Sequence, residues 1–257
     1  CALPICMGMA GLLRHRSAQL SGILNGIDTR EWDPARDRHL PQHYGPRRLE
    51  DKAGNKAALQ AEMGLAVRAD LPLLAVVSRL TEQKGLDLFL DVAARTLALP
   101  AQIVVLGSGA HALEHGWTAF AHRHPEQCAV RIGFDEGLAH RIEAGADIFV
   151  MPSRFEPCGL NQMYSLRYGT VPIVHKTGGL ADTVRPWHPR TRTGTGFVFE
   201  HHDAAGVRWA MQAALATYRD QPAWARLVDN GMAADFSWER QARRYEFLYD
   251  KLVGRDR

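Results

Sequence analysis

Residues 153–160, Ser-Arg-Phe-Glu-Pro-Cys-Gly-Leu, place one carboxylate between a predicted strand and a predicted helix start. The apolar run 146–152 is typical of a buried strand, and a helix-like segment begins near Gly159. Free backbone N–H groups at a helix start favour an anion. Glu156 lies beside them, where it would meet the other end of the same ligand, one rich in hydroxyl groups or with a carbon that gains positive charge. The stretch therefore predicts a site for a sugar nucleotide.

Two cations follow another strand candidate, residues 73–78, earlier in the chain. Arg79 and Lys84 lie five positions apart, and Gly85 comes directly after them. An arginine offers a rigid fork to phosphate oxygens, a lysine offers a point charge, and a glycine permits a close approach of backbone. These residues predict a diphosphate contact, with two solvated surface cations as the alternative for this segment alone.

Two glycine-rich turns also follow predicted strands. Gly107-Ser108-Gly109 with Ala112 matches the dinucleotide pattern G-x-G-x-x-A. That pattern requires an acidic residue after the next strand to hold a ribose, whereas Glu126 precedes that strand. A turn that makes room for a phosphate or base is therefore favoured over a nicotinamide site. The loop 176–180 carries paired glycines whose amides could face an anion or a polyhydroxylated ligand.

Two further patterns have simpler alternatives. Residues 111–115 match H-x-x-E-H, but a third ligand would have to come from elsewhere, and 12 histidines make chance matches easy, so we expect no metal. Cys158 near a helix start would have a lowered thiol pKa, yet Glu156 would oppose a thiolate and no histidine is marked as its base. Packing or a weak hydrogen bond to a ligand is favoured for Cys158.

Composition excludes several protein classes. The 257 residues are 46% hydrophobic and 23% charged, as in ordinary globular proteins. A net charge of +3 with dispersed basic residues argues against nucleic acid. No apolar run reaches the roughly 18 residues that span a bilayer, and no secretory pattern opens the chain. The four cysteines show no C-x-x-C spacing. We therefore expect a cytoplasmic protein that binds neither nucleic acid nor a membrane.

Short apolar runs alternate with amphipathic stretches, which predicts an α/β fold, a Rossmann-like doubly wound parallel sheet with ligands at the carboxyl ends of its strands. Continuously apolar strands indicate burial on both faces. The predicted strands are 73–78, 102–106, 129–134, 147–152, 171–175 and 196–200. The predicted helices are 50–63, 86–97, 110–123, 137–145, 160–168, 180–185, 203–218 with Asp203 as cap, 222–234 and 237–252 with Ser237 as cap.

Four motifs in order carry a resemblance that covers nearly the whole chain from Gly11 onward. They are Asn25–Asp28, Ser78–Thr81 with Gln83–Asp87, Pro152–Leu160 and Thr177–Thr183. The chain resembles the C-terminal half of the ADP-glucose-using bacterial glycogen synthases, which are related to plant starch synthases. The resemblance implies the C-terminal domain of a GT-B glycosyltransferase, with the active site in a cleft between two Rossmann-like domains. It also implies retaining transfer of glucose from ADP-glucose to the non-reducing end of an α-1,4-glucan, without a cofactor or an essential metal.

The resemblance also implies roles for single residues. Arg79 and Lys84 would neutralise the leaving diphosphate, and Glu156 would bind the donor glucose and stabilise the oxocarbenium-like transition state. The leaving phosphate would take the acceptor proton. By the resemblance, Phe134 would lie near adenine, Cys158, Gly159 and Leu160 would contact glucose and phosphate, and Thr183 would lie near the ribose and phosphates. Gly107, from its glycine turn, and Tyr164 are also predicted to bind the donor.

Tyr164 marks the subfamily. Many related retaining transferases carry a second glutamate eight residues after the first, to hold the nucleotide ribose. This chain has Tyr164 there, which fits the synthases that use ADP-glucose. Another GT-B transferase with a different sugar nucleotide is the alternative.

A second Lys-x-Gly-Gly-Leu loop, which the resemblance places in an N-terminal domain, is absent from this chain, and the start without Met indicates a fragment or a few foreign first residues. We expect residues 1–21 to be a remnant of the N-terminal domain. Residues 22–235 would form the nucleotide-sugar domain, and 236–257 a helix that packs back toward the missing domain. Such a chain would bind ADP or ADP-glucose without useful catalysis.

Overall fold

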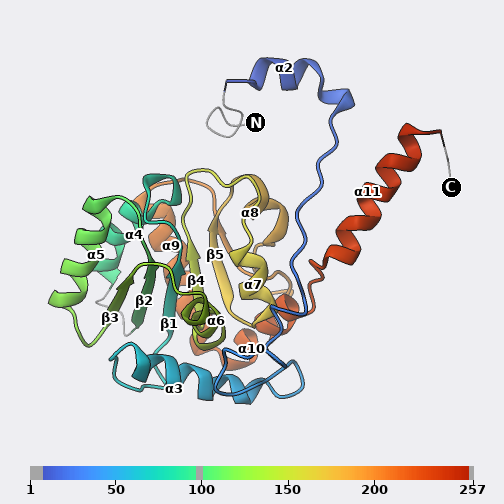
Figure 1. The fold of residues 1–257 in the computed structure, drawn as a ribbon. Helices are drawn as coiled ribbons and strands as arrows, with labels where there is room; N and C mark the ends of the chain where they lie inside the picture. The colour runs from blue at the N-terminus through green and yellow to red at the C-terminus, as the bar shows by residue number, and fades with distance from the viewer. Residues whose placement is uncertain (1–7, 97–100, 255–257) are drawn as a thin grey trace.

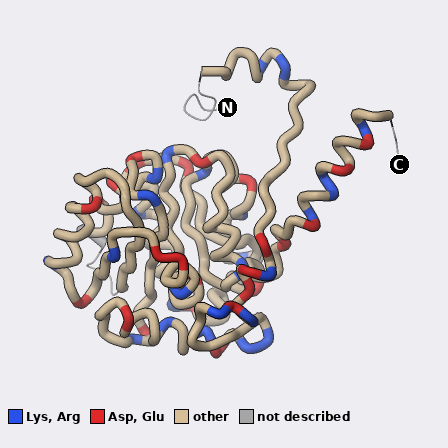
Figure 2. The backbone as a smooth tube through the Cα atoms, in the orientation of Figure 1, with Lys and Arg blue, Asp and Glu red and all other residues tan. Residues whose placement is uncertain are grey.

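The computed structural model describes residues 8–96 and 101–254; for residues 94–96 it describes the backbone alone. The expectation about the first few residues and the end of the helix predicted over 86–97 lie outside this part. No helix within it is long and apolar enough to cross a membrane. In the view of Figure 2, Lys and Arg positions are interspersed with Asp and Glu positions along the backbone.

A six-stranded parallel sheet forms the centre of the molecule, as predicted (Figure 1). Its order is β3-β2-β1-β4-β5-β6, the order of a doubly wound dinucleotide-type fold. The connection reverses direction between β1 and β4, and ligands of such sheets bind at the carboxyl ends near this point. The strands are β1 Leu73–Val77, β2 Gln102–Gly107, β3 Cys128–Ile132, β4 Ile148–Met151, β5 Val171–His175 and β6 Phe197–Phe199.

Helices cover both faces of the sheet because alternate strand residues point to opposite sides. Leu74 and Val76 join one core cluster, which α4, α5, α9 and α10 complete, and Leu73 and Ala75 join a second, with α3, α6 and α8. The helices are α2 Ala10–His15, α3 Lys52–Glu62, α4 Leu86–Thr96, α5 His111–Arg123, α6 Glu136–Gly145, α7 Asn161–Arg167, α8 Gly178–Thr183, α9 Ala204–Arg219, α10 Gln221–Met232 and α11 Trp238–Leu252.

The predicted caps are confirmed, while one burial prediction is wrong. Asp203 accepts a hydrogen bond from the N–H of Gly206 at the start of α9, and Ser237 accepts one from Arg240 at the start of α11. The carboxyl half of β3 is not buried on both faces, since Ile132 is 40% exposed. The reason is that β3 forms an edge of the sheet, a position that an apolar run does not reveal.

The helix expected near Gly159 begins two residues later, at Asn161, and spans only seven residues. Gly159 lies before it with φ of +72°, in the left-handed region. Glu156 therefore belongs to a loop whose glycine sets its turn, and the helix start itself is further from the carboxylate than the sequence indicated.

Both ends of the described chain leave the domain on the same side (Figure 1). They are joined at their base, where Ile27 N–H donates to the carbonyl of Phe236 at 2.9 Å and Gly26 lies against the backbone of Trp238. The helix α11 exposes large apolar side chains, including Phe247 at 72% and Leu252 at 72%. How this helix is covered in a longer protein stays a prediction.

Candidate functional site

A cavity of about 210 Å³ opens between the carboxyl ends of β1 and β4, at the reversal point of the sheet. Arg79 and Lys84 line it from the loop after β1. Gly159 and Leu160 line it from the loop after β4. Residues from two sequence regions thus meet where the fold class predicts a ligand.

The loops after β1 and β4 are fitted against each other. Gly85 has φ of +68°, and a Cβ there would lie 1.9 Å from the carbonyl oxygen of Pro152. Arg154 donates its N–H to the carbonyl of Gln83 at 2.9 Å. Its guanidinium also lies 2.5 Å from Asp87 Oδ2. These contacts explain the glycine at position 85 and fix the spacing between Lys84 and Glu156.

Lys84 and Glu156 form an ion pair at the wall of the cavity. Nζ lies 2.5 Å from Oε2, and the two side chains are 20% and 8% exposed. Ser153 Oγ lies 3.5 Å from the same carboxylate oxygen. A buried ion pair is costly unless the ions are well bonded. Here a carboxylate and a cation are held ready beside an open space, an arrangement that can stabilise charge developing on a ligand.

Two histidines, which the sequence analysis did not single out, hold the loop that carries Glu156. His175, the last residue of β5, has Nδ1 2.8 Å from the carbonyl oxygen of Ser153. His202 has Nε2 2.7 Å from that of Pro152. Burial lowers the pKa of His202, which favours a neutral ring donating its N–H. The position of His175 at the carboxyl end of a strand was the available signal.

The paired-glycine turn lies behind this loop. A Cβ on Gly179 would lie 2.1 Å from the carbonyl oxygen of Cys158, and the Gly179 N–H donates to the carbonyl of Glu156 at 3.1 Å. The amide of Gln162 donates to the carbonyls of Cys158 and Gly159, each at 3.1 Å. The Cys158 thiol is free and half-buried. One use of the paired glycines is therefore packing against the backbone of the Glu156 loop.

Two other predicted site residues support the loops from within. A Cβ on Gly107 would lie 1.8 Å from the carbonyl oxygen of Ser78, so only glycine fits at this position. The neighbouring Ser108 carbonyl accepts from Leu80 N–H at 2.8 Å, so the glycine turn is fixed to the segment after β1. Thr183 is buried, and its hydroxyl donates to the carbonyl of Gly179 at 2.6 Å.

Phe134 and Tyr164 lie apart from the Lys84–Glu156 pair, in different surroundings. Phe134 follows β3 and is 89% exposed. Tyr164 stacks on Trp32 at 3.7 Å between ring centroids, and burial raises the pKa of Tyr164 to about 12. The cavity and the ion pair thus bring Arg79, Lys84, Glu156, Gly159 and Leu160 together, and neither includes Cys158 or these two aromatic rings.

The H-x-x-E-H segment of α5 shows no metal geometry. Glu114 instead accepts the N–H of Gly109 at 2.7 Å. Within residues 8–96 and 101–254, the set of three metal-capable side chains that lie close together involves none of His111, Glu114 and His115.

A family model described as glycosyl transferases group 1 matches residues 64–231, more than half of the chain. The chain belongs to this family. Two glycogen synthases are among its similar relatives. That of Anaeromyxobacter dehalogenans (strain 2CP-C) is 58% identical over 94% of this chain and 51% of its own length. That of Dechloromonas aromatica (strain RCB) is 57% identical over 96% of this chain and 51% of its own length. The resemblance found in the motifs is confirmed, and the chain spans about half the length of the curated relatives it matches.

Solved structures agree with this assignment. The catalytic domain of starch synthase IV from Arabidopsis thaliana, bound to ADP and acarbose, matches with a TM-score of 0.89 and 38% identity, over 96% of this chain and 52% of that one. A sucrose-phosphate synthase from Thermosynechococcus elongatus, at 24% identity and a TM-score of 0.65 over 98% of this chain and 57% of that one, shares the fold. This chain, a member of the glycosyl transferases group 1 family, therefore forms a Rossmann-like domain of the GT-B type.

Proposed function

We propose that this chain is the donor-binding half of a retaining glucosyltransferase, which transfers glucose from ADP-glucose to the non-reducing end of an α-1,4-glucan. The observation that carries the proposal is the Lys84–Glu156 pair, 2.5 Å apart beside a cavity at the reversal point of the sheet. Relatives named glycogen synthase and a starch synthase bound to ADP support this donor and acceptor.

The residues of the cavity suit the chemistry of a leaving diphosphate. As the bond between the glucose C1 and the phosphate oxygen breaks, Arg79 and Lys84 neutralise the negative charge that develops. Glu156 holds the donor glucose and stabilises the positive charge on the sugar. The acceptor hydroxyl oxygen bonds to C1 on the same face, and its proton passes to the leaving phosphate. This scheme needs no cofactor.

The remaining predicted residues belong to donor binding. Gly159 and Leu160, which line the cavity, would contact the phosphates and the glucose together with Cys158. Gly107 and Thr183 would act by shaping the loops around the donor. Phe134 would reach adenine from its exposed loop, and Tyr164 would act through the position of α7.

A second candidate function is binding without transfer. It is favoured by the length of the match, since the chain spans about half of its relatives. A GT-B active site lies between two domains, so a chain with one such domain would bind ADP-glucose and lack part of the acceptor site. We favour this outcome for the 257-residue chain alone, and a cytoplasmic location stays a prediction.

Glucose transfer and nucleotide binding, measured on the same purified chain, test both candidates. We expect calorimetry to show ADP binding and a radiolabelled ADP-glucose assay with glycogen to show little transfer. Robust turnover would contradict the binding-only candidate, and absence of ADP binding at millimolar concentration would contradict the donor site. Competition between ADP-glucose and UDP-glucose would fix the base. NADH binding tighter than ADP would favour a dehydrogenase instead.

A further inference from the structure

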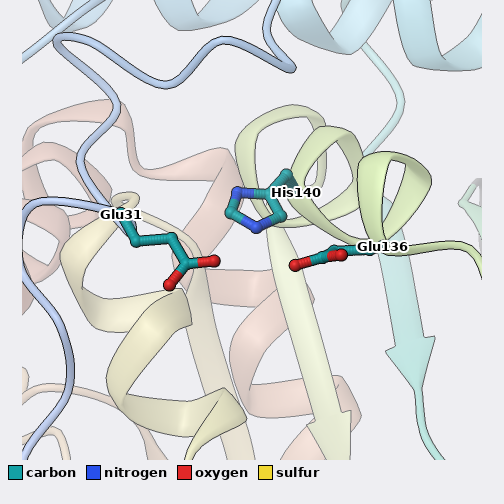
Figure 3. Close-up of side chains that lie close together, drawn as sticks. All are labelled: Glu31, Glu136 and His140. Atoms are coloured by element: carbon teal, nitrogen blue, oxygen red, sulfur yellow. The ribbon is translucent and has the colours of Figure 1, made fainter.

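Three metal-capable side chains converge at the start of α6, outside the cavity that holds the Lys84–Glu156 pair. Glu31, Glu136 and His140 each offer one ligand atom, and these atoms all lie within 4.8 Å of one another (Figure 3). Glu136 and His140 are four residues apart, so they share one face of the helix. Glu31 comes from the loop before α3, where Asp28 Oδ1 accepts its N–H at 3.2 Å.

The ring of His140 is fixed in orientation before any ligand arrives. It is 1% exposed, and its Nδ1 lies 2.7 Å from Asp37 Oδ2. Asp37 also accepts the hydroxyl of Tyr168 at 2.6 Å and the N–H of His39 at 2.9 Å, so it acts as a carboxylate. Trp32 covers the ring face, with centroids 3.7 Å apart. A carboxylate on Nδ1–H leaves Nε2 as the basic nitrogen, as in second-shell partners of metal-binding histidines.

The other ring nitrogen lacks a partner. His140 Nε2 is buried and makes no hydrogen bond to any residue within 8–96 and 101–254. It faces the gap between the two exposed glutamate carboxylates (Figure 3). A buried polar atom without a partner costs stability, and a lone pair facing two anions adds repulsion. A cation at this point would satisfy all three groups.

We propose that Glu31, Glu136 and His140 Nε2 bind a divalent transition metal ion, with zinc as the best fit. One imidazole nitrogen and two carboxylate oxygens match the ligands of zinc, whereas magnesium and calcium prefer oxygen alone. Three protein ligands leave a coordination position for water. The exposed glutamates can turn to bring an oxygen to about 2.0–2.2 Å from the ion.

The proposed ion would connect the loop around Glu31 to α6. Trp32, the next residue, lies between His140 on one side and Tyr164 of α7 on the other, with both pairs of centroids 3.7 Å apart. The helix α7 follows directly on Leu160, which lines the donor cavity. The ion would therefore be a positioning element that fixes Trp32 and, through it, α7.

Metal titration of the chelator-treated 257-residue chain tests the proposal without any activity measurement. We expect one equivalent of Zn²⁺ in calorimetry and a visible absorption band with Co²⁺. A hundredfold excess over Kd should raise the unfolding midpoint by about 5–10 °C. Glu31→Gln and Glu136→Gln should each weaken zinc binding at least tenfold. Both side chains are exposed, so these variants should fold, as circular dichroism would check.

Two control variants separate this site from adventitious binding. Glu126→Gln removes another exposed glutamate and should leave zinc affinity unchanged. The double change of His111 and His115 to Gln removes a histidine pair with metal-like spacing and should also have no effect. The proposal is overturned if the unsubstituted chain binds no zinc, if loss of binding follows the histidine pair, or if both glutamate variants bind normally. Equal affinity for Mg²⁺ would overturn the metal class.

Discussion

Two lysine–carboxylate pairs lie at opposite ends of the same two strands, β1 and β4. At the amino ends, Lys56 and Asp147 are 2.7 Å apart with 8% and 13% side-chain exposure. At the carboxyl ends, Lys84 and Glu156 are 2.5 Å apart with 20% and 8% exposure. By distance and burial alone the pairs are alike, and the larger cavity, about 350 Å³, adjoins the amino-end pair.

The two pairs differ in how many of their hydrogen-bond donors and acceptors already have partners within the protein. Lys56 Nζ also lies 2.6 Å from the carbonyl of Leu71 and 3.1 Å from the hydroxyl of Tyr218. Asp147 accepts the N–H of Leu73 at 2.8 Å. Burial alone would lower the pKa of Lys56, but Asp147 and Tyr218 outweigh it and raise the pKa. In the described structure Lys84 Nζ bonds Glu156 alone, so it keeps donors for a ligand. Unused donors, rather than cavity size, distinguish Lys84–Glu156, the pair that we propose to act on the donor, from Lys56–Asp147.

The largest effect should come from breaking the amino-end pair. Lys56→Met leaves Asp147 buried without its cation, and loss of one partner of such a pair costs about 3–5 kcal/mol. Urea unfolding followed by circular dichroism measures the loss. If the free energy of unfolding fell by less than about 1 kcal/mol, the assignment of a structural role to this pair would be wrong. ADP affinity of the folded fraction should not change.

The carboxyl-end carboxylate should affect turnover rather than folding. In a full-length transferase that contains this chain, Glu156→Gln should lower turnover by about two to three orders of magnitude, the size found when one preorganised electrostatic contact is removed. Affinity for ADP should stay close to normal, because the proposal places Glu156 against the sugar, which ADP lacks. Steady-state kinetics together with ADP calorimetry checks both halves. Near-normal turnover would remove Glu156 from its catalytic role.

The matching lysine change sharpens the contrast between the two ends. Lys84→Ala should weaken ADP binding about tenfold, the cost of one charge-assisted hydrogen bond of about 1.4 kcal/mol. Its effect on unfolding should be smaller than that of Lys56→Met, since Lys84 lines the cavity and is 20% exposed, whereas Lys56 is 8% exposed. Unchanged ADP affinity would favour the alternative from the sequence, in which Lys84 is a solvated surface cation without a role in binding.

The sequence predicted the frame of the site but not its contacts. Apolar runs located every strand, because burial in a parallel sheet dictates residue type continuously along each strand. Topology then placed Arg79, Lys84 and Glu156 on one edge, yet the bond between Lys84 and Glu156 joins residues 72 positions apart. Local patterns cannot show such a pairing.

The region around His140 was missed for the same physical reason. Its ring depends on Asp37, 103 residues away, and on Trp32, in a segment without periodicity. The H-x-x-E-H match drew attention to α5 because its spacing is local, whereas the ligands Glu136 and His140 are completed only by Glu31 from a distant loop. Non-local convergence leaves no trace in residue spacing.

The smallest effect should come from the exposed end of the carboxyl edge. Phe134 is 89% exposed, so Phe134→Ala should change the free energy of unfolding by less than about 0.5 kcal/mol. If its ring stacks on adenine, ADP affinity should fall about fivefold, near the lower limit for stacking of a base on an aromatic side chain. Phe134→Tyr is the matched control and should retain affinity. Equal ADP binding by the alanine variant would place adenine elsewhere, and would restrict the ligand-binding part of the edge to Arg79, Lys84 and the Glu156 loop.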